Sequence, residues 1–573
     1  MSADETKYGR VPLSVRLRFD RLQFLALSLI AILVVVLLTS DGLLLKYGTS
    51  RKNEMLVRRT NRGVRVQQSH RRTTVLSLET NWKDVDSDSN SCNGFFGNGY
   101  SDIFEIYKSS AHTRNNVGGL ITCFGHPTTL AMSCELRSVI MNSDKIEMTF
   151  GGESVDEMMS RSEQEKNGKK RCLPFLNQGA FEVLESGYET VASNIKMTET
   201  SLPVNDEGAR SHGRDLLKKN APRLVEWLSA TDKFKLEFLE TLQILNTEAA
   251  LKSVCSLRVE APVIFVTRVE HANLFHTTTD WYNVWSAAKL AGLEPTMDYK
   301  VEKLTPRSLL TPFTDAPKFP AHIVFLDGHN AGPVDQGWLS LFLSVSYAKH
   351  FSGPTCFDHL IYAPFGYVSA ISVGITTRQQ ECRTNPYIRA FSDDFVLGLG
   401  ITPRKTSTCA DDGPAKVVFV QRTVSLSHPS KLVRRLDNED EIMKALRAQI
   451  NKDGSKVTLL QGDYAGMSIT EQVKSVQDAC VIAGAHGAGL SHVLFAPPEV
   501  HMLEIQPPLF TRPHFIAYSF WSGANHHTWT IESSAPSVQK VVSKVIETAK
   551  QAVAEAKGEG LKKGEGGDHK ILF

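Results

Sequence analysis

The residues best suited to bind an anion lie in a glycine-rich segment near the end of the chain, residues 481–495. An apolar run leads into a loop with three glycines, and a helical pattern and a second apolar run follow. Glycines let the backbone approach a ligand closely, and a helix N-terminus presents unpaired N–H groups. This order predicts a site for a phosphate-bearing ligand. The predicted contacts are His486, Gly487, Ala488 and Gly489.

Two other interpretations of this loop stay open, a tight turn without a ligand and the oxyanion loop of an esterase. The esterase needs a Gly-x-Ser-x-Gly nucleophile motif, which the sequence lacks. The common dinucleotide and P-loop glycine motifs are absent as well. The local chemistry therefore favours phosphate over an ester.

Longer motifs extend this pattern over residues 92–529. They are Cys92-Asn-Gly-Phe-Phe-Gly-Asn98, Gly151-Gly-Glu153, Gln178-Gly-Ala-Phe181, Asn273-Leu-Phe-His-Thr-Thr-Thr-Asp-Trp-Tyr282, Val324-Phe-Leu-Asp-Gly-His329, Thr511-Arg-Pro-His-Phe515 and Trp521-Ser-Gly-Ala-Asn-His-His527. In content and order they resemble glycosyltransferase family 61, and within it the plant-type enzymes that add xylose to N-glycan cores. The resemblance implies inverting transfer from UDP-xylose, in β-1,2 linkage, to the core β-mannose.

Transfer of this kind needs positive charge on the departing diphosphate. Arg422 follows a predicted strand, and ligands of open α/β sheets bind beyond the carboxyl ends of strands. We therefore expect Arg422 and His486 to contact the diphosphate, and Glu504, which ends the next strand, to hold ribose hydroxyls. The alternative for Arg422 is a surface charge at the end of a strand, and the alternative for Glu504 is a carboxylate with a structural role. Gln472 and Arg512 are weaker donor-binding candidates.

Transfer also needs a base for the acceptor hydroxyl. Asp280 fits best and His276 competes, since four residues separate them and place both on one face of a helix. Trp281 and Tyr282 beside them suit a platform for the acceptor sugar. The alternative is that these residues only fix a strand-to-helix turn or belong to the core.

Other functions remain possible on the same residues. An inactive lumenal glycan-binding protein would keep the aromatic residues but lose Arg422, His486 or Asp280, and all three are present. Within the family, transfer of N-acetylglucosamine or arabinose is the alternative to xylose.

The predicted fold is α/β. Apolar runs at 261–266, 322–326 and 416–422 read as buried strands, and strands alternate with helices to about residue 531. Such alternation predicts parallel sheets covered by helices. We expect an acceptor-side domain over 91–400, a nucleotide-sugar domain over 401–535, and a helix with a disordered tail over 536–573. By resemblance, the two Rossmann-like domains face each other in the GT-B arrangement.

The N-terminal region predicts a membrane anchor. Residues 22–40 carry no charge and, as a helix, span about 28 Å, close to the thickness of a bilayer core. We expect a cytoplasmic tail over 1–21, a transmembrane signal anchor over 22–40 and a stem over 41–90. By resemblance this is a single-pass type II protein of the Golgi membrane with a lumenal catalytic part.

No metal or other cofactor is expected. The Asp-x-Asp triplets between residues 84 and 88 lie in an acidic, serine-rich run without a preceding strand, and none occurs elsewhere. His271 and His276 are five residues apart, which matches no common helical pair of ligands. The formal net charge of +2 gives no reason to expect nucleic acid as a partner.

Nine cysteines are present, and none forms a Cys-x-x-Cys pair. Several should form disulfides in a lumenal protein. The odd number leaves at least one without a partner in the chain, and Cys480, at the start of a buried strand, is the expected core thiol. The absence of Asn-x-Ser/Thr sites weakens the lumenal expectation slightly.

Overall fold

The computed structural model describes most of the chain after residue 91. The described ranges are 92–110, 118–147, 175–185, 210–245, 255–268, 270–311, 316–329, 331–422, 435–452, 456–508 and 512–559. All of them belong to one compact unit, Gln68–Phe573. The expected anchor, stem and Asp-x-Asp triplets, the motif Gly151-Gly-Glu153 and the tail from 560 lie outside these ranges.

Within the described ranges, no helix has both the length and the apolar content that crossing a bilayer requires.

The first half of the described chain forms a mixed sheet of twelve strands. In its main path the order is β11-β13-β12-β10-β14-β3-β6-β8-β7. Off this path, β2 pairs with β3, β1 pairs with β2, and β9 pairs with β14. The strands are β1 (Asp102–Lys108), β2 (Leu120–Gly125), β3 (Met132–Asn142), β6 (Phe181–Leu184), β7 (Arg210–His212), β8 (Gln243–Leu245), β9 (Leu257–Val259), β10 (Val263–Val266), β11 (Leu309–Leu310), β12 (Phe319–Phe325), β13 (Phe342–Tyr347) and β14 (Pro354–Tyr362). Strands β4 (Ile146–Glu147) and β5 (Phe175–Leu176) form a separate pair.

This sheet is parallel only in part, unlike the expected Rossmann-like sheet. Strand β10 pairs in parallel with β12 and β14, whereas β3 pairs antiparallel with both β2 and β14. The connections explain the difference. Six residues between β2 and β3 suffice for an antiparallel turn, while the parallel pair β10 and β12 is joined by a crossover that contains helix α11 (Leu274–Leu290).

The second half forms the expected parallel sheet. Its order is β16-β15-β17-β18-β19, and every pairing is parallel. The strands are β15 (Ala415–Val420), β16 (Val457–Leu460), β17 (Val481–Ala485), β18 (His501–Gln506) and β19 (Asn525–Thr530). Chain order reverses between β15 and β17. In open α/β sheets this switch point opens the crevice that binds ligands.

Helices cover both faces of each sheet, which explains the continuous apolar strands. Along β15, Val417 and Phe419 join one core cluster and Val418 and Val420 another. The covering helices include α7 (Gly213–Asn220), α8 (Pro222–Thr231), α9 (Lys233–Thr241), α12 (Trp338–Leu341), α14 (Pro386–Gly398), α15 (Glu439–Lys452), α16 (Ile469–Gln477), α17 (His514–Ser522), α18 (Val538–Ala556) and the 3₁₀ helix η11 (Ala488–Phe495). The helix expected after Pro536 is α18, and it packs with α15 on the second sheet.

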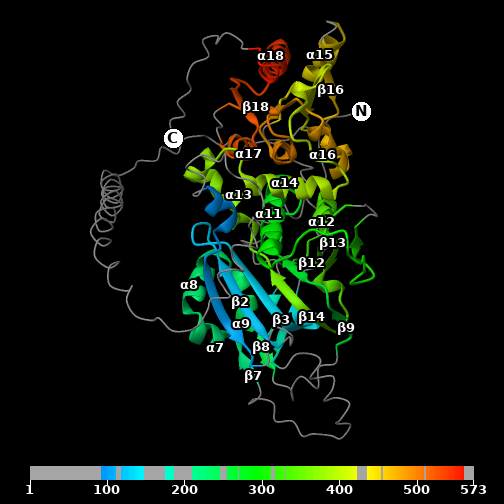
Figure 1. Ribbon diagram of the computed structural model, residues 1–573. Helices are drawn as coiled ribbons and strands as arrows, with labels where there is room; N and C mark the ends of the chain where they lie inside the picture. Colours follow the sequence, from blue (N-terminus) through cyan, green and yellow to red (C-terminus); the bar gives the residue numbers. More distant parts are fainter. Residues whose placement is uncertain are drawn as a thin grey trace, which may run out of the picture. The chain divides into compact units, whose positions relative to one another are not determined.

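One hydrophobic cluster is shared by the two sheets. It contains side chains of α11, α14, α17 and η11. The helices α11, α14 and α17 lie near one another in Figure 1. Hydrogen bonds cross the same region: Arg389 Nη1 on α14 donates to the carbonyl of Ala496, just after η11, at 2.8 Å. Trp521 Nε1 on α17 donates to the carbonyl of Gln379 in η8 (Arg378–Glu381) at 2.7 Å. The site-bearing edges of both sheets are therefore fixed to one core.

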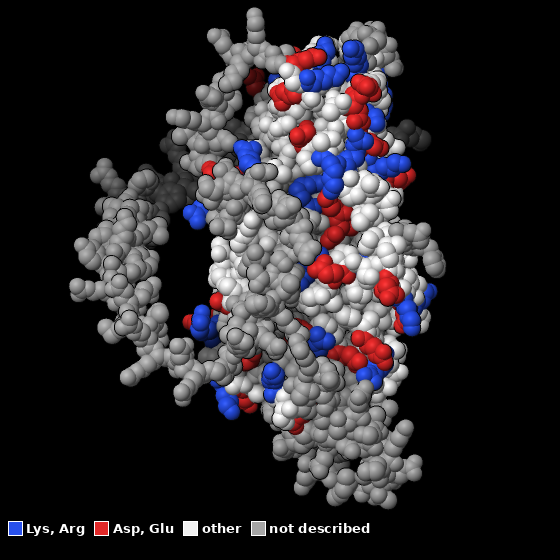
Figure 2. All heavy atoms as spheres, in the orientation of Figure 1, with Lys and Arg blue, Asp and Glu red and all other residues white. Residues whose placement is uncertain are grey.

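Acidic and basic side chains are interspersed on the part of the face in Figure 2 that is not grey. They alternate there without a large field of one sign, in keeping with the net charge of +2.

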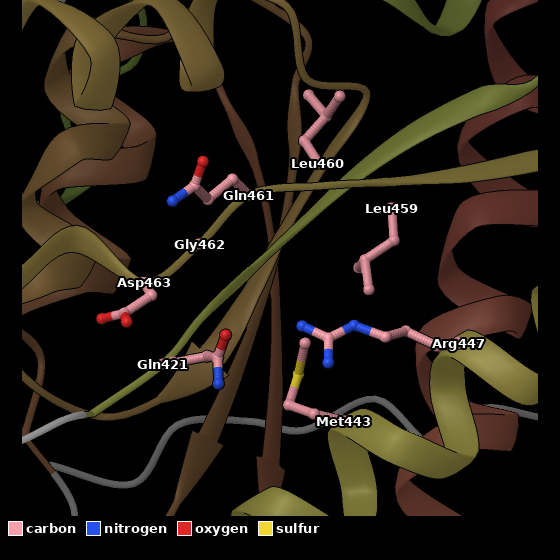
Figure 3. A pocket seen from close by; sticks show the side chains of 8 residues that line it. All are labelled: Gln421, Met443, Arg447, Leu459, Leu460, Gln461, Gly462 and Asp463. Atoms are coloured by element: carbon pink, nitrogen blue, oxygen red, sulfur yellow. The ribbon is translucent and has the colours of Figure 1, made fainter. Parts of the chain in front are cut away.

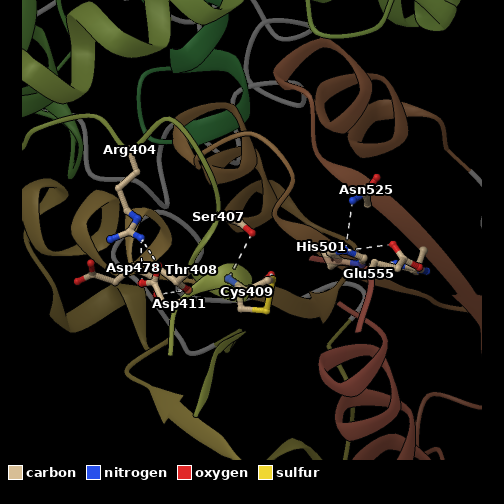
Figure 4. Close-up of a disulfide and its surroundings, with 11 residues drawn as sticks. Arg404, Ser407, Thr408, Cys409, Asp411, Asp478, His501, Asn525 and Glu555 are labelled. Atoms are coloured by element: carbon tan, nitrogen blue, oxygen red, sulfur yellow. Dashed lines mark hydrogen bonds and ion pairs between the residues drawn. A yellow bond between two sulfur atoms is a disulfide. The ribbon is translucent and has the colours of Figure 1, made fainter. Parts of the chain in front are cut away.

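Four disulfides stabilise this unit and correct the expectation for Cys480. They are Cys92–Cys382, Cys123–Cys134, Cys255–Cys356 and Cys409–Cys480. Cys480 is thus not a thiol. Its partner, Cys409, lies in the segment before β15. In the same segment, Arg404 donates a hydrogen bond to Asp411 at 2.8 Å (Figure 4). The remaining cysteine, Cys172, lies outside the described ranges.

Removing Cys409–Cys480 should lower stability more than removing Cys123–Cys134. All four sulfur-bearing residues are buried, but the sequence separations are 71 and 11 residues. Closing the longer loop restricts the unfolded chain more, by about 4 against about 3 kcal/mol. The urea midpoints of the two double alanine variants measure the difference. Equal midpoints would show that loop closure does not set the order.

Candidate active site

Arg422 lies at the switch point of the second sheet, just beyond the end of β15. Its Nη1 donates to the His486 carbonyl at 2.7 Å, which links the carboxyl ends of β15 and β17. The guanidinium also lies against Gly487, where a Cβ would come within 1.7 Å of Nη1. Gly487 is therefore required for this close approach.

His486 is held by a buried carboxylate. Its Nδ1 hydrogen-bonds to Glu504 Oε1, and the second oxygen of Glu504 accepts from His526 Nε2 at 2.9 Å. Burial alone would raise the pKa of Glu504, but the bonds from His486 and His526 outweigh it and leave the pKa below its ordinary value. Glu504 is fully buried, so it orients His486 and offers no oxygen to a ribose, contrary to the sequence-based expectation.

The loop after β17 leads into η11, at the position where the sequence predicts an anion site. Gly487 precedes η11, and no side chain caps the start of this helix. Orphan N–H groups at such a start attract anions. The helix is 3₁₀ instead of α. Gly489 packs against β15, where a Cβ would come within 2.8 Å of Val420 Cγ1.

The two weaker candidates differ in their surroundings. Gln472 donates both amide hydrogens to backbone carbonyls, to Tyr464 at 3.0 Å and to Met467 at 2.8 Å. It therefore fixes the loop after β16, which is a structural role. Arg512 is exposed and precedes α17.

A hollow of about 430 Å³ opens beside Gln421, the residue before Arg422 in the sequence (Figure 3). It lies among the ends of β15 and β16 and the first half of α15. Its lining is Gln421, Met443, Arg447, Leu459, Leu460, Gln461, Gly462 and Asp463. The volume is within the range of small-molecule sites, and two amides, a cation and a carboxylate provide both donors and acceptors.

His276 and Asp280 lie at the start of α11, one turn apart, but in different environments. The His276 side chain is 22% exposed, and its Nε2 lies 3.0 Å from Glu270 Oε2. Asp280 is buried under Gly366, where a Cβ would come within 2.1 Å of Oδ1.

The two groups also differ in their titration. Burial raises the pKa of Asp280 well above its ordinary value. The nearby carboxylates of Asp327 and Glu270 raise this pKa further, whereas Arg268 and the backbone N–H of Gly366 lower it. Burial lowers the pKa of His276 below its ordinary value, and Glu270 partly opposes that shift. At neutral pH, His276 is therefore in the form that accepts a proton, whereas the raised pKa of Asp280 favours the protonated carboxyl. On these grounds we rank His276 above Asp280 as the candidate base, the reverse of the order expected from the sequence.

Trp281 and Tyr282 are core residues. Both side chains are at most 1% exposed. Trp281 packs on Phe395 with ring centroids 4.7 Å apart, and the Tyr282 hydroxyl donates to the Phe96 carbonyl at 2.6 Å. Neither ring has a face for a sugar, so the expected acceptor platform is wrong.

A chain of aromatic contacts connects the base candidates with the anion candidates. The His276 ring lies 5.2 Å from Phe275, Phe275 lies 5.0 Å from His514, and His514 lies 5.9 Å from His486. Phe275 also stacks on Tyr518 at 5.5 Å. The start of α11 and the glycine-rich loop therefore meet across α17.

Comparison with known proteins identifies the family of this chain. The family model for glycosyltransferase 61 matches residues 375–503. A beta-1,2-xylosyltransferase of Arabidopsis thaliana is 31% identical over 493 residues, 80% of this chain and 85% of that protein. The chain belongs to glycosyltransferase family 61.

Other relatives of this transferase carry two different names. A beta-1,2-xylosyltransferase of Oryza sativa subsp. japonica is 29% identical over 472 residues, 79% of this chain and 78% of that protein. An EGF domain-specific O-linked N-acetylglucosamine transferase of Gallus gallus is 22% identical over 275 residues, 47% of this chain and 44% of that protein.

Several polar residues that contact the candidate site residues were not predicted from the sequence. Glu270 and Tyr367 accompany His276, and Glu439 accepts from the Arg422 backbone N–H at 2.9 Å. Glu270 follows β10, so the carboxyl-end rule that selected Arg422 would have found it too. Tyr367 lies far from α11 in sequence and carries no such signal.

The loop that carries Glu270 has a rigid base. Arg268 is fully buried and donates from Nη1 to both oxygens of Asp335, at 3.0 and 2.9 Å, and from Nη2 to Asp327 at 2.9 Å. The His271 ring stacks on His329 with centroids 4.5 Å apart. These contacts fix Arg268 and His271, which lie on either side of Glu270 in the sequence.

In the part of the chain that the structure describes, no group of three or more His, Cys, Asp or Glu side chains is arranged to hold a metal ion. His526 and His527 are neighbours on β19 and point to opposite faces: His526 contacts Glu504, and His527 Nε2 lies 2.9 Å from His501 Nδ1.

Proposed function

We propose that this transferase moves xylose from UDP-xylose, with inversion, in β-1,2 linkage to the core β-mannose of N-glycans. The names of its Arabidopsis and rice relatives support the sugar and the linkage. The N-glycan core rests on the motif resemblance. One observation carries the transfer mechanism. Ring contacts run from His276 through Phe275 and His514 to His486, whose carbonyl accepts from Arg422.

In the proposed step, the acceptor oxygen forms a bond to C1 of xylose as the bond from C1 to the β-phosphate oxygen breaks. UDP leaves with the electron pair of that bond. The hydroxyl proton passes to His276. Because Nε2 of this ring faces Glu270 at 3.0 Å, the accepting atom is Nδ1.

The proposed donor site is the switch point of the second sheet. Arg422, His486 and the start of η11 neutralise the diphosphate, and Gly487 and Ala488 approach it through the backbone. The nucleoside extends toward the hollow that Gln421 and Asp463 line. With the acceptor on the α11 side, the two halves act as facing domains in the GT-B manner.

We propose that the reaction needs no metal, because Arg422, His486 and the helix start supply the positive charge. EDTA should leave the initial rate unchanged, and added Mn²⁺ should not raise it. The measurement is the rate of UDP release with the metal-stripped enzyme. A rate that EDTA abolishes and Mn²⁺ restores contradicts this part of the proposal.

The proposed location is the Golgi membrane, in type II orientation. The uncharged run 22–40 supports a membrane anchor, and the resemblance to type II Golgi enzymes supports the compartment and orientation.

The experiment that tests the function uses the full-length chain in detergent, a core N-glycan acceptor and a panel of nucleotide sugars. We expect UDP-xylose alone to add one pentose to the glycan, measured by mass spectrometry. The panel includes UDP-N-acetylglucosamine and UDP-arabinose, because part of the chain also resembles N-acetylglucosamine transferases. Transfer of either sugar instead of xylose would assign the donor differently, and binding without transfer would indicate an inactive lectin.

A further inference from the structure

We propose that Tyr367, Glu270 and His276 form the subsite that binds the pyranose ring accepting the new sugar. The aromatic face of Tyr367 supports the ring, and Glu270 accepts hydrogen bonds from its hydroxyls. This inference rests on the proposed function and adds its acceptor contacts.

The three side chains form one contact group from three segments of the chain. Glu270 lies beyond β10, His276 on α11 and Tyr367 on the short helix η6 (Gly366–Val368). Glu270 Oε2 lies 3.0 Å from His276 Nε2, and its Oε1 accepts from the Tyr367 hydroxyl. The Tyr367 ring lies 5.0 Å from the His276 ring.

The group is accessible, unlike the aromatic residues first expected to bind the acceptor. Tyr367 is 40% exposed, and the Glu270 side chain is 41% exposed. An exposed aromatic ring beside a carboxylate is amphipathic, as is a pyranose ring with its C–H face and equatorial hydroxyls. Sites for small polar ligands combine such aromatic surface with a few fixed polar groups.

The group is also held in place before any ligand binds. Below Glu270, Arg268 is locked between Asp327 and Asp335. Below Tyr367, Gly366 packs on Asp280, so a side chain at that position would displace η6 from α11. A site that is ordered in advance loses less entropy on binding.

The position of the group matches the chemistry. His276 belongs both to this group and to the ring contacts that lead to His486. A sugar on Tyr367 would therefore have its hydroxyls next to the proposed base and on the same side as the donor.

The test measures acceptor binding and turnover separately, with the full-length chain in detergent. Direct titration of a core N-glycan in the presence of UDP gives its Kd, and transfer assays give the KM values of both substrates. Tyr367→Ala should raise the glycan Kd and KM by about tenfold or more, a loss typical of one interface anchor, and leave the KM of UDP-xylose unchanged. Tyr367→Phe keeps the ring and should remain within about threefold of the wild type.

Glu270→Gln should raise the glycan Kd by roughly tenfold, as for loss of a hydrogen bond to a charged group. It should also shift the acid limb of the kcat profile. The titratable groups facing His276 are Glu270 and Tyr367, with Asp280 one turn along α11. Removing the negative charge of Glu270 lowers the pKa of His276 further, so the limb should move to lower pH.

Matched controls are Met297→Ala, an exposed apolar side chain at 55%, and Glu302→Gln, an exposed carboxylate. Both should behave as the wild type. An unchanged glycan Kd in Tyr367→Ala and Glu270→Gln would overturn the subsite, and if the wild type still transfers xylose the proposed function stands. Weaker glycan binding in both variants, with another sugar transferred, would support the subsite and refute the xylose assignment. A wild type that binds no core N-glycan would overturn both.

Discussion

Replacing His276 by glutamine is expected to lower kcat by roughly 10²–10⁴-fold, the usual contribution of a general base. Glutamine keeps a polar group of similar length but cannot take the acceptor proton. UDP binding should be unchanged, because the proposed diphosphate contacts belong to the second sheet. Single-turnover transfer and UDP titration measure the two effects separately.

Asp280→Asn is the matched control for this prediction. Its carboxyl is buried one turn from His276, and the raised pKa favours a neutral group that asparagine imitates in shape. We expect a loss of less than about tenfold. If Asp280→Asn loses more than His276→Gln, the two roles are exchanged. If both variants bind UDP poorly, the start of α11 has only a structural role.

The pH profile gives an independent check on the base. In the proposed step the neutral His276 ring accepts the proton, so kcat should fall as the pH decreases through the pKa of this ring and stay level above it. Burial places that pKa below the ordinary value of about 6.5. An acid limb centred above this value would argue against His276.

Replacing Arg422 by alanine is expected to lower kcat/KM by roughly 10²–10³-fold, the loss found when a donor to a developing anion is removed. In the proposed site the guanidinium stabilises the charge that appears on the departing diphosphate. The loss should appear mainly in kcat, since that charge is largest in the transition state.

Arg404→Ala is the control for Arg422→Ala. Arg404 belongs to the same half of the chain and forms an exposed ion pair with Asp411 at 2.8 Å. Surface pairs of this kind contribute little, so activity should remain near the wild-type value. An unchanged kcat/KM for Arg422→Ala would remove this residue from the site.

The sequence predicted the second sheet well because its pattern is local. Each strand is a short apolar run, and the glycines between β17 and η11 predict a tight loop from the local sequence alone. The carboxyl-end rule then placed Arg422 and His486 together, and the hydrogen bond between them confirms that placement.

The errors concern burial, which depends on distant segments. Nothing near Trp281 in sequence shows that Phe395 and Phe495 will cover its ring. Likewise, the position of Glu504 in the sequence does not show that its side chain is fully buried and that His526, on the next strand, bonds to its second oxygen. Cys480 was misjudged because its partner, Cys409, lies 71 residues earlier.

The stereochemistry of the product tests the central claim most directly. In the proposed mechanism, one base acts from the α11 side and Arg422 and His486 hold the diphosphate, so transfer would be a single displacement that inverts the anomeric carbon. UDP-α-xylose and a core N-glycan should therefore give a β-linked xylose on the 2-hydroxyl of the core mannose, as read by the NMR of the isolated product. An α-linked product, or xylose on another residue, would contradict the account.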